Sequence, residues 1–89
     1  MIKPVTGVEN FDKVISKGNV IVGFSAPWCG YCRRLRPIME KVSEEVQVPI
    51  YGVNCDEDKE LASRYEVDTI PNLIFFRDGK PVDLSLIQI

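Results

Sequence analysis

A pair of cysteines at the junction of an apolar run and a helical pattern constrains this chain more than any other feature. The apolar run Val20–Phe24 (VIVGF) is followed, three residues later, by the segment 28–32 (WCGYC). Apolar side chains then recur at helical spacing, at Leu35, Ile38, Met39, Val42 and Val46. The pattern therefore predicts a buried strand, a turn that carries the cysteines, and a long helix.

The spacing of the two cysteines indicates their chemistry. On the first turn of a helix, the side chains of Cys29 and Cys32 lie one above the other. Their separation then lies within the range of a disulfide, whose Cα atoms are about 4.4–6.8 Å apart. Cys29 also lies where backbone N–H groups and the positive end of the helix dipole favour a thiolate. The segment therefore predicts a site of thiol–disulfide exchange.

The composition of the chain excludes several classes of protein and of partner. The chain has 89 residues, three cysteines, no histidine and a net charge of −2, which predicts one domain over residues 1–89 with a modest core. An odd number of cysteines argues against a secreted disulfide framework and favours a reducing, cytoplasmic setting. A closed zinc site needs a fourth ligand, so no metal is expected. Neither nucleic acid nor a membrane is expected as partner, because no charge block, signal peptide or span of about 20 apolar residues occurs.

The other periodic segments alternate between helix and strand. Thr6 and Glu9 fit a capping box for a first helix, and a long helix with Pro37 inside it is predicted from about Cys29 to Val46. Asp56 or Asp58 is expected to cap a short helix. The expected strands are Val20–Phe24, Pro49–Asn54, Asn72–Phe76 and, after an Asp-Gly turn, Pro81–Leu86. This order predicts a small α/β sandwich with a parallel core and an antiparallel edge.

Several of these segments make the chain similar to the thioredoxin family. Residues 24–32 (FSAPWCGYC) resemble the family's active-site run, and Pro37 stands where the family's helix has its proline. Residues 53–56 (VNCD), 69–73 (TIPNL) and 76–80 (FRDGK) resemble a strand end, the loop with a cis-proline and the last turn. The resemblance implies a thioredoxin-like three-layer sandwich, with a mixed four- to five-stranded sheet and about three helices.

The resemblance also implies roles for residues. Cys29 would attack a substrate disulfide as a thiolate, and Cys32 would resolve the mixed disulfide. The residues implied in substrate binding are Trp28, Gly30, Tyr31, Ile70 and Pro71. The implied activity is that of a protein-disulfide reductase, a thioredoxin-type electron carrier with the Cys29–Cys32 disulfide as its redox centre and no other bound cofactor. Its implied partners are disulfide-containing proteins and a recycling enzyme of the thioredoxin-reductase type, and a monomer or weak dimer is expected.

At three places the sequence departs from the family pattern, and these departures limit which family properties the resemblance implies for this chain. Gly23 and Gly52 stand where many thioredoxins have a buried acid and a lysine, so the proton of Cys32 would pass to water or to a distal group such as Glu40. The dipeptide Gly30-Tyr31 replaces the usual Gly-Pro and resembles that of bacterial disulfide isomerases. The chain also stops at residues 86–89 (LIQI), so the usual terminal helix is expected to be absent.

Alternatives remain open from the residues. One is a glutaredoxin-like, glutathione-coupled reductase, although glutaredoxins carry Pro-Tyr between their cysteines and lack the preceding tryptophan. Another is a redox-gated binding module without turnover, whose cysteines could bridge a cluster between protomers. Cys55 is interpreted as a small apolar residue at a strand end, with a regulatory or dimer-forming thiol as the alternative. The acidic residues 56–58 are interpreted as helix capping.

Overall fold

The computed structural model describes residues 2–82 of the chain. Its helices are α1 (Val8–Ile15), α2 (Gly30–Glu45) and α3 (Lys59–Arg64). Its strands are β1 (Ile2–Pro4), β2 (Asn19–Ser25), β3 (Ile50–Asn54), β4 (Asn72–Arg77) and β5 (Lys80–Pro81). They form one sheet in the order β1-β3-β2-β4-β5. The first three are parallel, and β4 and β5 are antiparallel to their neighbours.

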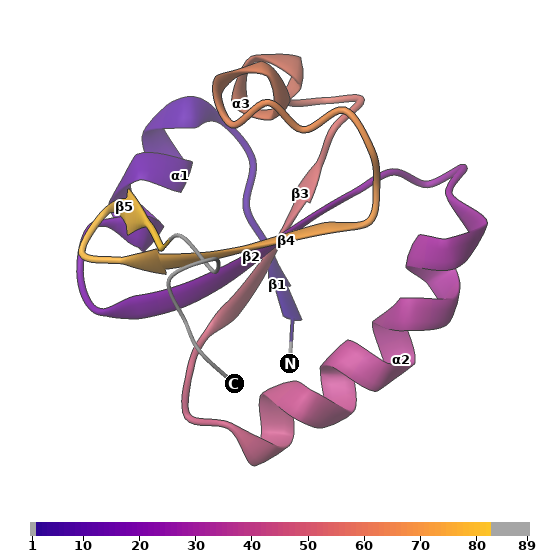
Figure 1. Cartoon of the computed structure of the whole chain (residues 1–89), viewed down its shortest axis with the longest axis horizontal. Coiled ribbons are helices and arrows are strands. Elements are labelled where there is room, and N and C mark those ends of the chain that lie inside the picture. The colour runs from indigo at the N-terminus through magenta and orange to yellow at the C-terminus, as the bar shows by residue number, and fades with distance from the viewer. Residues whose placement is uncertain (1, 83–89) are drawn as a thin grey trace.

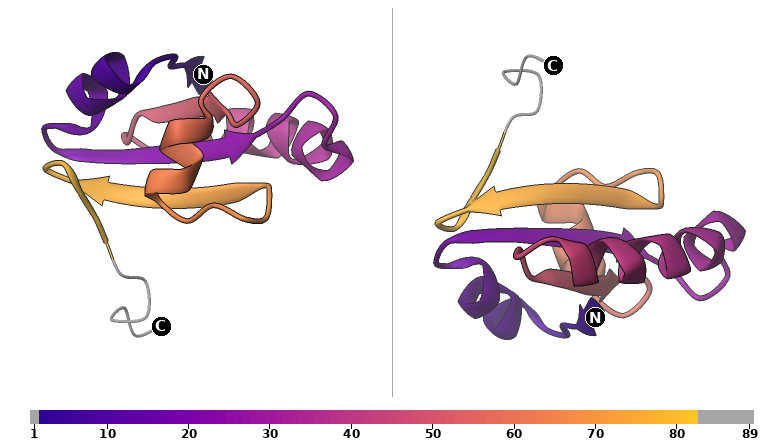
Figure 2. Two further views of the ribbon diagram at one scale, coloured as in Figure 1. Left: turned by 90° about the horizontal axis from the view of Figure 1, so that it is seen from above. Right: turned by 90° about the horizontal axis from the view of Figure 1, so that it is seen from below.

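The elements form three layers. Helices α1 and α3 cover one face of the sheet, and α2 lies on the opposite face (Figures 1 and 2). This arrangement confirms the predicted mixed sandwich. Strand β1 was not predicted, because a three-residue strand that contains Lys3 and Pro4 has no alternating apolar pattern. Its parallel pairing with β3 is a long-range contact that only the folded chain forms.

The core lies between the sheet and the pair α1 and α3. Its largest members are the rings of Phe11, Phe24 and Phe76, each 0% exposed. The Phe11 ring lies 5.7 Å from that of Phe76 in an edge-on arrangement and 6.5 Å from that of Phe24. Such offset aromatic contacts add to the free energy gained by burying the rings. The core therefore depends on one side chain of α1 that contacts two different strands.

The opposite face of the sheet is less well covered. On β2, Val20, Val22 and Phe24 are buried, but the alternate residues Ile21 and Gly23 are only half-buried. The prediction of a buried strand therefore holds for the side of α1 and α3 and is wrong for the α2 side. The physical reason is that no side chain of α2 becomes fully buried and the helix approaches the sheet mainly at β1.

The capping box predicted from Thr6 and Glu9 is also wrong. Helix α1 begins at Val8, its N-cap is Gly7 with φ 91°, and no side chain caps it. The positive φ of Gly7 makes the chain enter the helix one residue later than expected, a conformation that glycine tolerates best. The N–H of Gly7 donates instead to Oδ1 of Asp58, 3.1 Å away. Asp58 is the N-cap of α3, as predicted, but its carboxylate bonds α1 rather than its own helix.

Replacing Asp58 by alanine is expected to lower the free energy of unfolding by about 1–2 kcal/mol. The Gly7 N–H would lose its acceptor, and the starts of α1 and α3 would lose their connection. Urea denaturation followed by circular dichroism measures the change. Glu57→Ala is the matched control, because it removes a charge from the same turn but breaks only an exposed bond to Asn54. Equal losses in the two variants would contradict this role of Asp58.

Two expectations fall partly outside the described residues. The last strand was predicted at Pro81–Leu86, and β5 is described only at Lys80–Pro81. Its remainder, and the expected absence of a terminal helix, lie outside residues 2–82. The single domain over residues 1–89 stays a prediction.

Candidate active site

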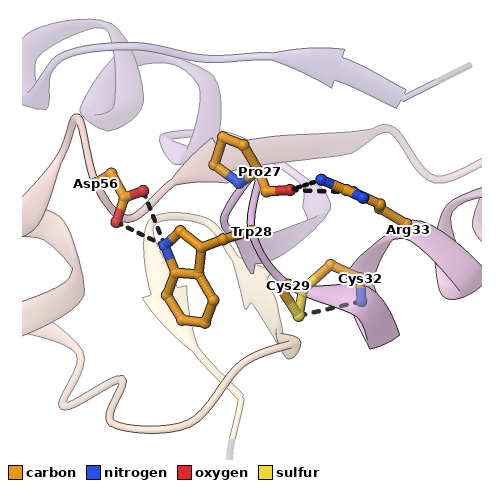
Figure 3. Close-up of a disulfide and its surroundings, with 6 residues drawn as sticks. All are labelled: Pro27, Trp28, Cys29, Cys32, Arg33 and Asp56. Carbon is orange, nitrogen blue, oxygen red and sulfur yellow. Dashed lines mark hydrogen bonds between the residues drawn. A yellow bond between two sulfur atoms is a disulfide. The ribbon is translucent and has the colours of Figure 1, made fainter.

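Cys29 and Cys32 form a disulfide at the start of α2, with their Cα atoms 5.3 Å apart (Figure 3). Strand β2 ends at Ser25, and a turn follows in which the Cys29 N–H donates to the carbonyl of Ala26. This turn makes Cys29 the N-cap of α2. The Cys32 N–H donates to the Sγ atom of Cys29 over 3.1 Å. Negative charge on the Cys29 sulfur would therefore be stabilised by this amide and by the helix dipole.

The two cysteines differ in exposure. The Cys29 residue is only 6% exposed, whereas Cys32 is half-buried. Two aromatic side chains near the pair are far more exposed, Trp28 at 68% and Tyr31 at 72%. Exposed aromatic groups of this size are typical of surfaces that contact other molecules. Gly30, between them in the sequence, is exposed at the first residue of α2.

Asp56 holds the indole of Trp28. The indole Nε1–H donates to both carboxylate oxygens, at 3.2 Å and 3.0 Å (Figure 3). Because β2 and β3 are parallel, the residues that follow them meet at the same edge of the sheet. Sequence reasoning missed this contact and assigned Asp56 to helix capping. No local signal could have shown it, since the partners lie far apart in the chain.

Arg33 holds the turn on the other side of the disulfide. Its Nε and Nη2 atoms donate to the carbonyl oxygen of Pro27, at 3.1 Å and 2.7 Å (Figure 3). Such charge-assisted bonds from a planar guanidinium fix geometry better than a single neutral bond. The turn before Cys29 therefore carries a fixed positive group.

The loop before β4 comes close to the same site. The Ile70–Pro71 peptide bond is cis, as predicted. Ile70 is half-buried and packs against the core, whereas Pro71 is exposed. Pro71 and Cys32 both line one cavity. Residues about forty positions apart in the sequence thus meet at one site.

This cavity, of about 530 Å³, lies between α2 and the sheet. Gly23 and Gly52 line it and stand directly opposite each other on β2 and β3. Arg33 and Arg36 are its charged lining residues, and none of the described residues that line it is a carboxylate. The positions where the family pattern has an acid and a lysine are therefore adjacent and both lack a side chain.

Cys55 lies just past the end of β3, with its N–H donating to the carbonyl of Ser25. It is half-buried and packs against the core. Burial and, to a smaller extent, the nearby charge of Asp56 raise the pKa of the Cys55 thiol. The thiol is therefore held in its protonated, less reactive form.

Within residues 2–82, no group of three or more His, Cys, Asp or Glu side chains has the arrangement of a metal site. In the same part of the chain, no helix is long and apolar enough to cross a membrane.

Comparisons with known proteins agree with this geometry. The family model described as Thioredoxin matches residues 3–86. A thioredoxin of Chlamydia pneumoniae is 47% identical over 83 residues, which cover 92% of this chain and 80% of that protein. Protein disulfide-isomerase A4 of Rattus norvegicus is 41% identical, over 86% of this chain and 13% of that protein.

Solved structures show the same likeness. The crystal structure of thioredoxin from Trypanosoma brucei brucei superposes with a TM-score of 0.89 at 30% identity, over 93% of this chain and 75% of that one. The structure of a thioredoxin mutant from Halobacterium salinarum superposes with a TM-score of 0.85 at 35% identity, over 91% of this chain and 73% of that one. Because the family model covers nearly the whole chain and the cysteine pair stands at the start of α2 after β2, the chain belongs to the thioredoxin family of thiol–disulfide oxidoreductases.

Proposed function

We propose that the chain is a protein-disulfide reductase in which Cys29 is the nucleophile and Cys32 the resolving residue. The observation that supports this order is the position of Cys29 as N-cap of α2, with its sulfur accepting the Cys32 N–H. In the first step the Cys29 thiolate attacks one sulfur of a substrate disulfide, and the other sulfur leaves as a thiolate. The Cys32 thiolate then attacks Cys29, forms the intramolecular disulfide and releases the second substrate thiolate. Two electrons pass to the substrate.

The substrate surface consists of Trp28, Gly30, Tyr31, Ile70 and Pro71. The two exposed aromatic rings offer flat apolar contacts, and the bond to Asp56 fixes the orientation of the Trp28 ring. The backbone of Ile70, beside the exposed Pro71, would pair with an extended substrate segment. Gly30 is exposed between the two cysteines, and a Cβ there would meet no atom within 4 Å.

We infer that the proton of Cys32 passes to water in the cavity. Cys32 lines the cavity together with Gly23 and Gly52, and its described lining offers no carboxylate as acceptor. The other candidate, Glu40, lies on a later turn of α2, where its Oε1 accepts the N–H of Ile2. Water that enters this cavity is therefore the acceptor that we propose.

The partners follow from this chemistry. Disulfide-containing proteins are the substrates, and an enzyme of the thioredoxin-reductase type restores the dithiol. The Cys29–Cys32 couple is the redox group, with no other cofactor needed for the exchange. A cytoplasmic location fits an active dithiol that must be kept reduced. The active unit is one domain, acting as a monomer or weak dimer.

Reduction of insulin tests the proposal. With dithiothreitol as reductant, the chain is expected to precipitate insulin B chain well above the background rate of dithiothreitol alone. With NADPH as electron source, a thioredoxin reductase should support turnover, whereas glutathione with glutathione reductase should not. Turnover that depends on glutathione would favour the glutaredoxin-like alternative. No rate above background with any reductant would favour a binding module and overturn the proposal.

A further inference from the structure

We propose that opposite charges at the two ends of the active site, from Arg33 and Asp56, make the chain prefer disulfides flanked by one acidic and one basic residue in a fixed order. This inference rests on the protein-disulfide exchange proposed above and specifies the class of substrate. The acidic residue of the substrate lies toward Arg33, and the basic residue lies toward Asp56. The same two residues in the reverse order would meet like charges at both ends.

The end of the site formed by α2 is positive. Arg33 and Arg34 are both exposed. The two bonds from Arg33 to the carbonyl of Pro27 fix its guanidinium but do not neutralise it. Arg34 lies over the ring of Tyr31, 5.7 Å from its centroid, so its charge also lies beside a proposed substrate contact. Residues 26–39 contain no Asp or Glu, so no neighbour in the sequence opposes these charges.

The end of the site formed by the loop after β3 is negative. Asp56 is exposed, and the side chain that it binds is the neutral indole of Trp28. An N–H donor of this kind orients a carboxylate but leaves its charge in place. Residues 54–58 contain two further carboxylates and no Lys or Arg. A substrate cation at this end would therefore meet an attractive charge.

The two charges stay apart from each other. Figure 3 shows Asp56 at one end of the site, bonded to Trp28, and Arg33 at the other end, bonded to Pro27. Neither side chain has an ion-pair partner among residues 2–82. Both charges are therefore available to a bound substrate, and a single charge of the substrate cannot satisfy both of them.

The geometry of an extended segment decides which substrate residues meet these charges. The substrate cysteine must point toward Cys29 for the exchange. Residues two positions before and after it then point to the same side, each about 6–7 Å along the segment. Charged side chains at these two positions would reach the two ends of the site, whereas those at the adjacent positions point away.

Four blocked peptides test the order of charges. Each is a symmetric disulfide dimer, and their sequences are Glu-Gly-Cys-Gly-Lys, Lys-Gly-Cys-Gly-Glu, Glu-Gly-Cys-Gly-Glu and Lys-Gly-Cys-Gly-Lys. The prereduced chain reduces them in single turnover, which converts one peptide disulfide to two thiols and the Cys29–Cys32 dithiol to a disulfide. Acid quenching and chromatography measure the rates. Each rate is divided by that for uncharged dithiothreitol, which removes differences in the reactivity of the peptides themselves.

We expect the two mixed peptides to be the fastest and the slowest of the four, about fivefold or more apart, because each exposed charge pair changes the rate by a factor of about 1.5–5. This spread should disappear as the Debye length falls from about 30 Å at about 0.01 M salt to about 3 Å at about 1 M. Equal rates for the two mixed peptides would overturn the proposal. A larger spread between the two like-charged peptides would also overturn it, because net charge would then decide.

Variants assign the preference to its two ends. Arg33→Gln and Asp56→Asn should each lower the ratio of the two mixed peptides about twofold. Arg33→Lys should retain the ratio because it keeps the charge. Asn at position 56 keeps an oxygen for the Trp28 N–H, and Glu60→Gln is its control, since it removes an exposed charge from the first turn of α3. If Arg33→Gln and Asp56→Asn slowed all four peptides equally, their role would be structural and the assignment would be wrong.

Reduction of insulin separates this inference from the proposed function. If the unaltered chain reduces neither insulin nor any of the peptides, the proposed function fails. If it reduces insulin and reduces the two mixed peptides at the same rate, only the preference for an order of charges is overturned. The comparison of peptides uses the unaltered chain, so it does not depend on how well any variant folds.

Discussion

Replacing Cys29 by serine is expected to reduce insulin turnover to the background of the reductant, a loss of about 10³-fold or more. A serine hydroxyl stays protonated near neutral pH, so the start of α2 would offer no anionic nucleophile. The Cys32 N–H would then face an oxygen that carries no charge. The turbidity assay with dithiothreitol measures the loss. Activity that persists in Cys29→Ser would show that Cys32 or Cys55 can start the exchange.

Cys32→Ser is expected to fail in a different way. Cys29 would still attack the substrate, but no second thiol would release it, so a covalent complex should accumulate. Non-reducing gel electrophoresis with insulin detects this complex, and dithiothreitol should remove it. Cys55→Ser is the matched control and should retain turnover, because burial and the nearby Asp56 raise the pKa of the Cys55 thiol and keep it protonated. Trapping by Cys29→Ser instead would reverse the assigned order of the cysteines.

Replacing Phe11 by alanine is expected to lower the free energy of unfolding by about 3–5 kcal/mol. The ring is 0% exposed, and its loss leaves a cavity where Phe24, Tyr65 and Phe76 now contact it. Small domains have about 5–15 kcal/mol of total stability, so this variant should be partly unfolded at 37 °C. Urea denaturation followed by circular dichroism measures the loss.

Phe75→Ala is the matched control for Phe11→Ala. Phe75 is the same residue type in β4, but it is only half-buried and lies on the face that α2 covers incompletely. Its loss should cost clearly less, because the site is already open to water on one side. Equal losses would mean that the α2 face contributes as much to stability as the face covered by α1 and α3.

The longer elements could be predicted because their signals are local. The apolar run of β2 and the helical spacing of α2 predicted both elements to within about two residues. Short elements and caps were less predictable. Thr6 and Glu9 have the local pattern of a capping box, but the N–H of Gly7 finds a better partner in Asp58. Strand β1 depends on pairing with β3 and has no signal of its own.

The site shows the same division. Cys29, Cys32 and the Ile70–Pro71 bond could be identified from short motifs, and the structure brings these segments together. The hydrogen bond between Trp28 and Asp56 could not be predicted from a short motif, because it joins the segments that follow two parallel strands. Parallel strands are joined by long crossovers, so residues that meet at one edge of the sheet are distant in the chain.

The amino-acid sequence by itself determined the family, the cysteine pair and the order of the elements, since each depends on neighbouring residues. The tertiary structure alone decided what surrounds that pair. In the folded chain Cys29 is more buried than Cys32, and Gly23 lies opposite Gly52. A cavity lined by Cys32, Arg33 and Arg36 separates α2 from the sheet. The reason is packing: α2 meets the sheet mainly at β1, and the resulting space depends on how layers fit rather than on any local pattern.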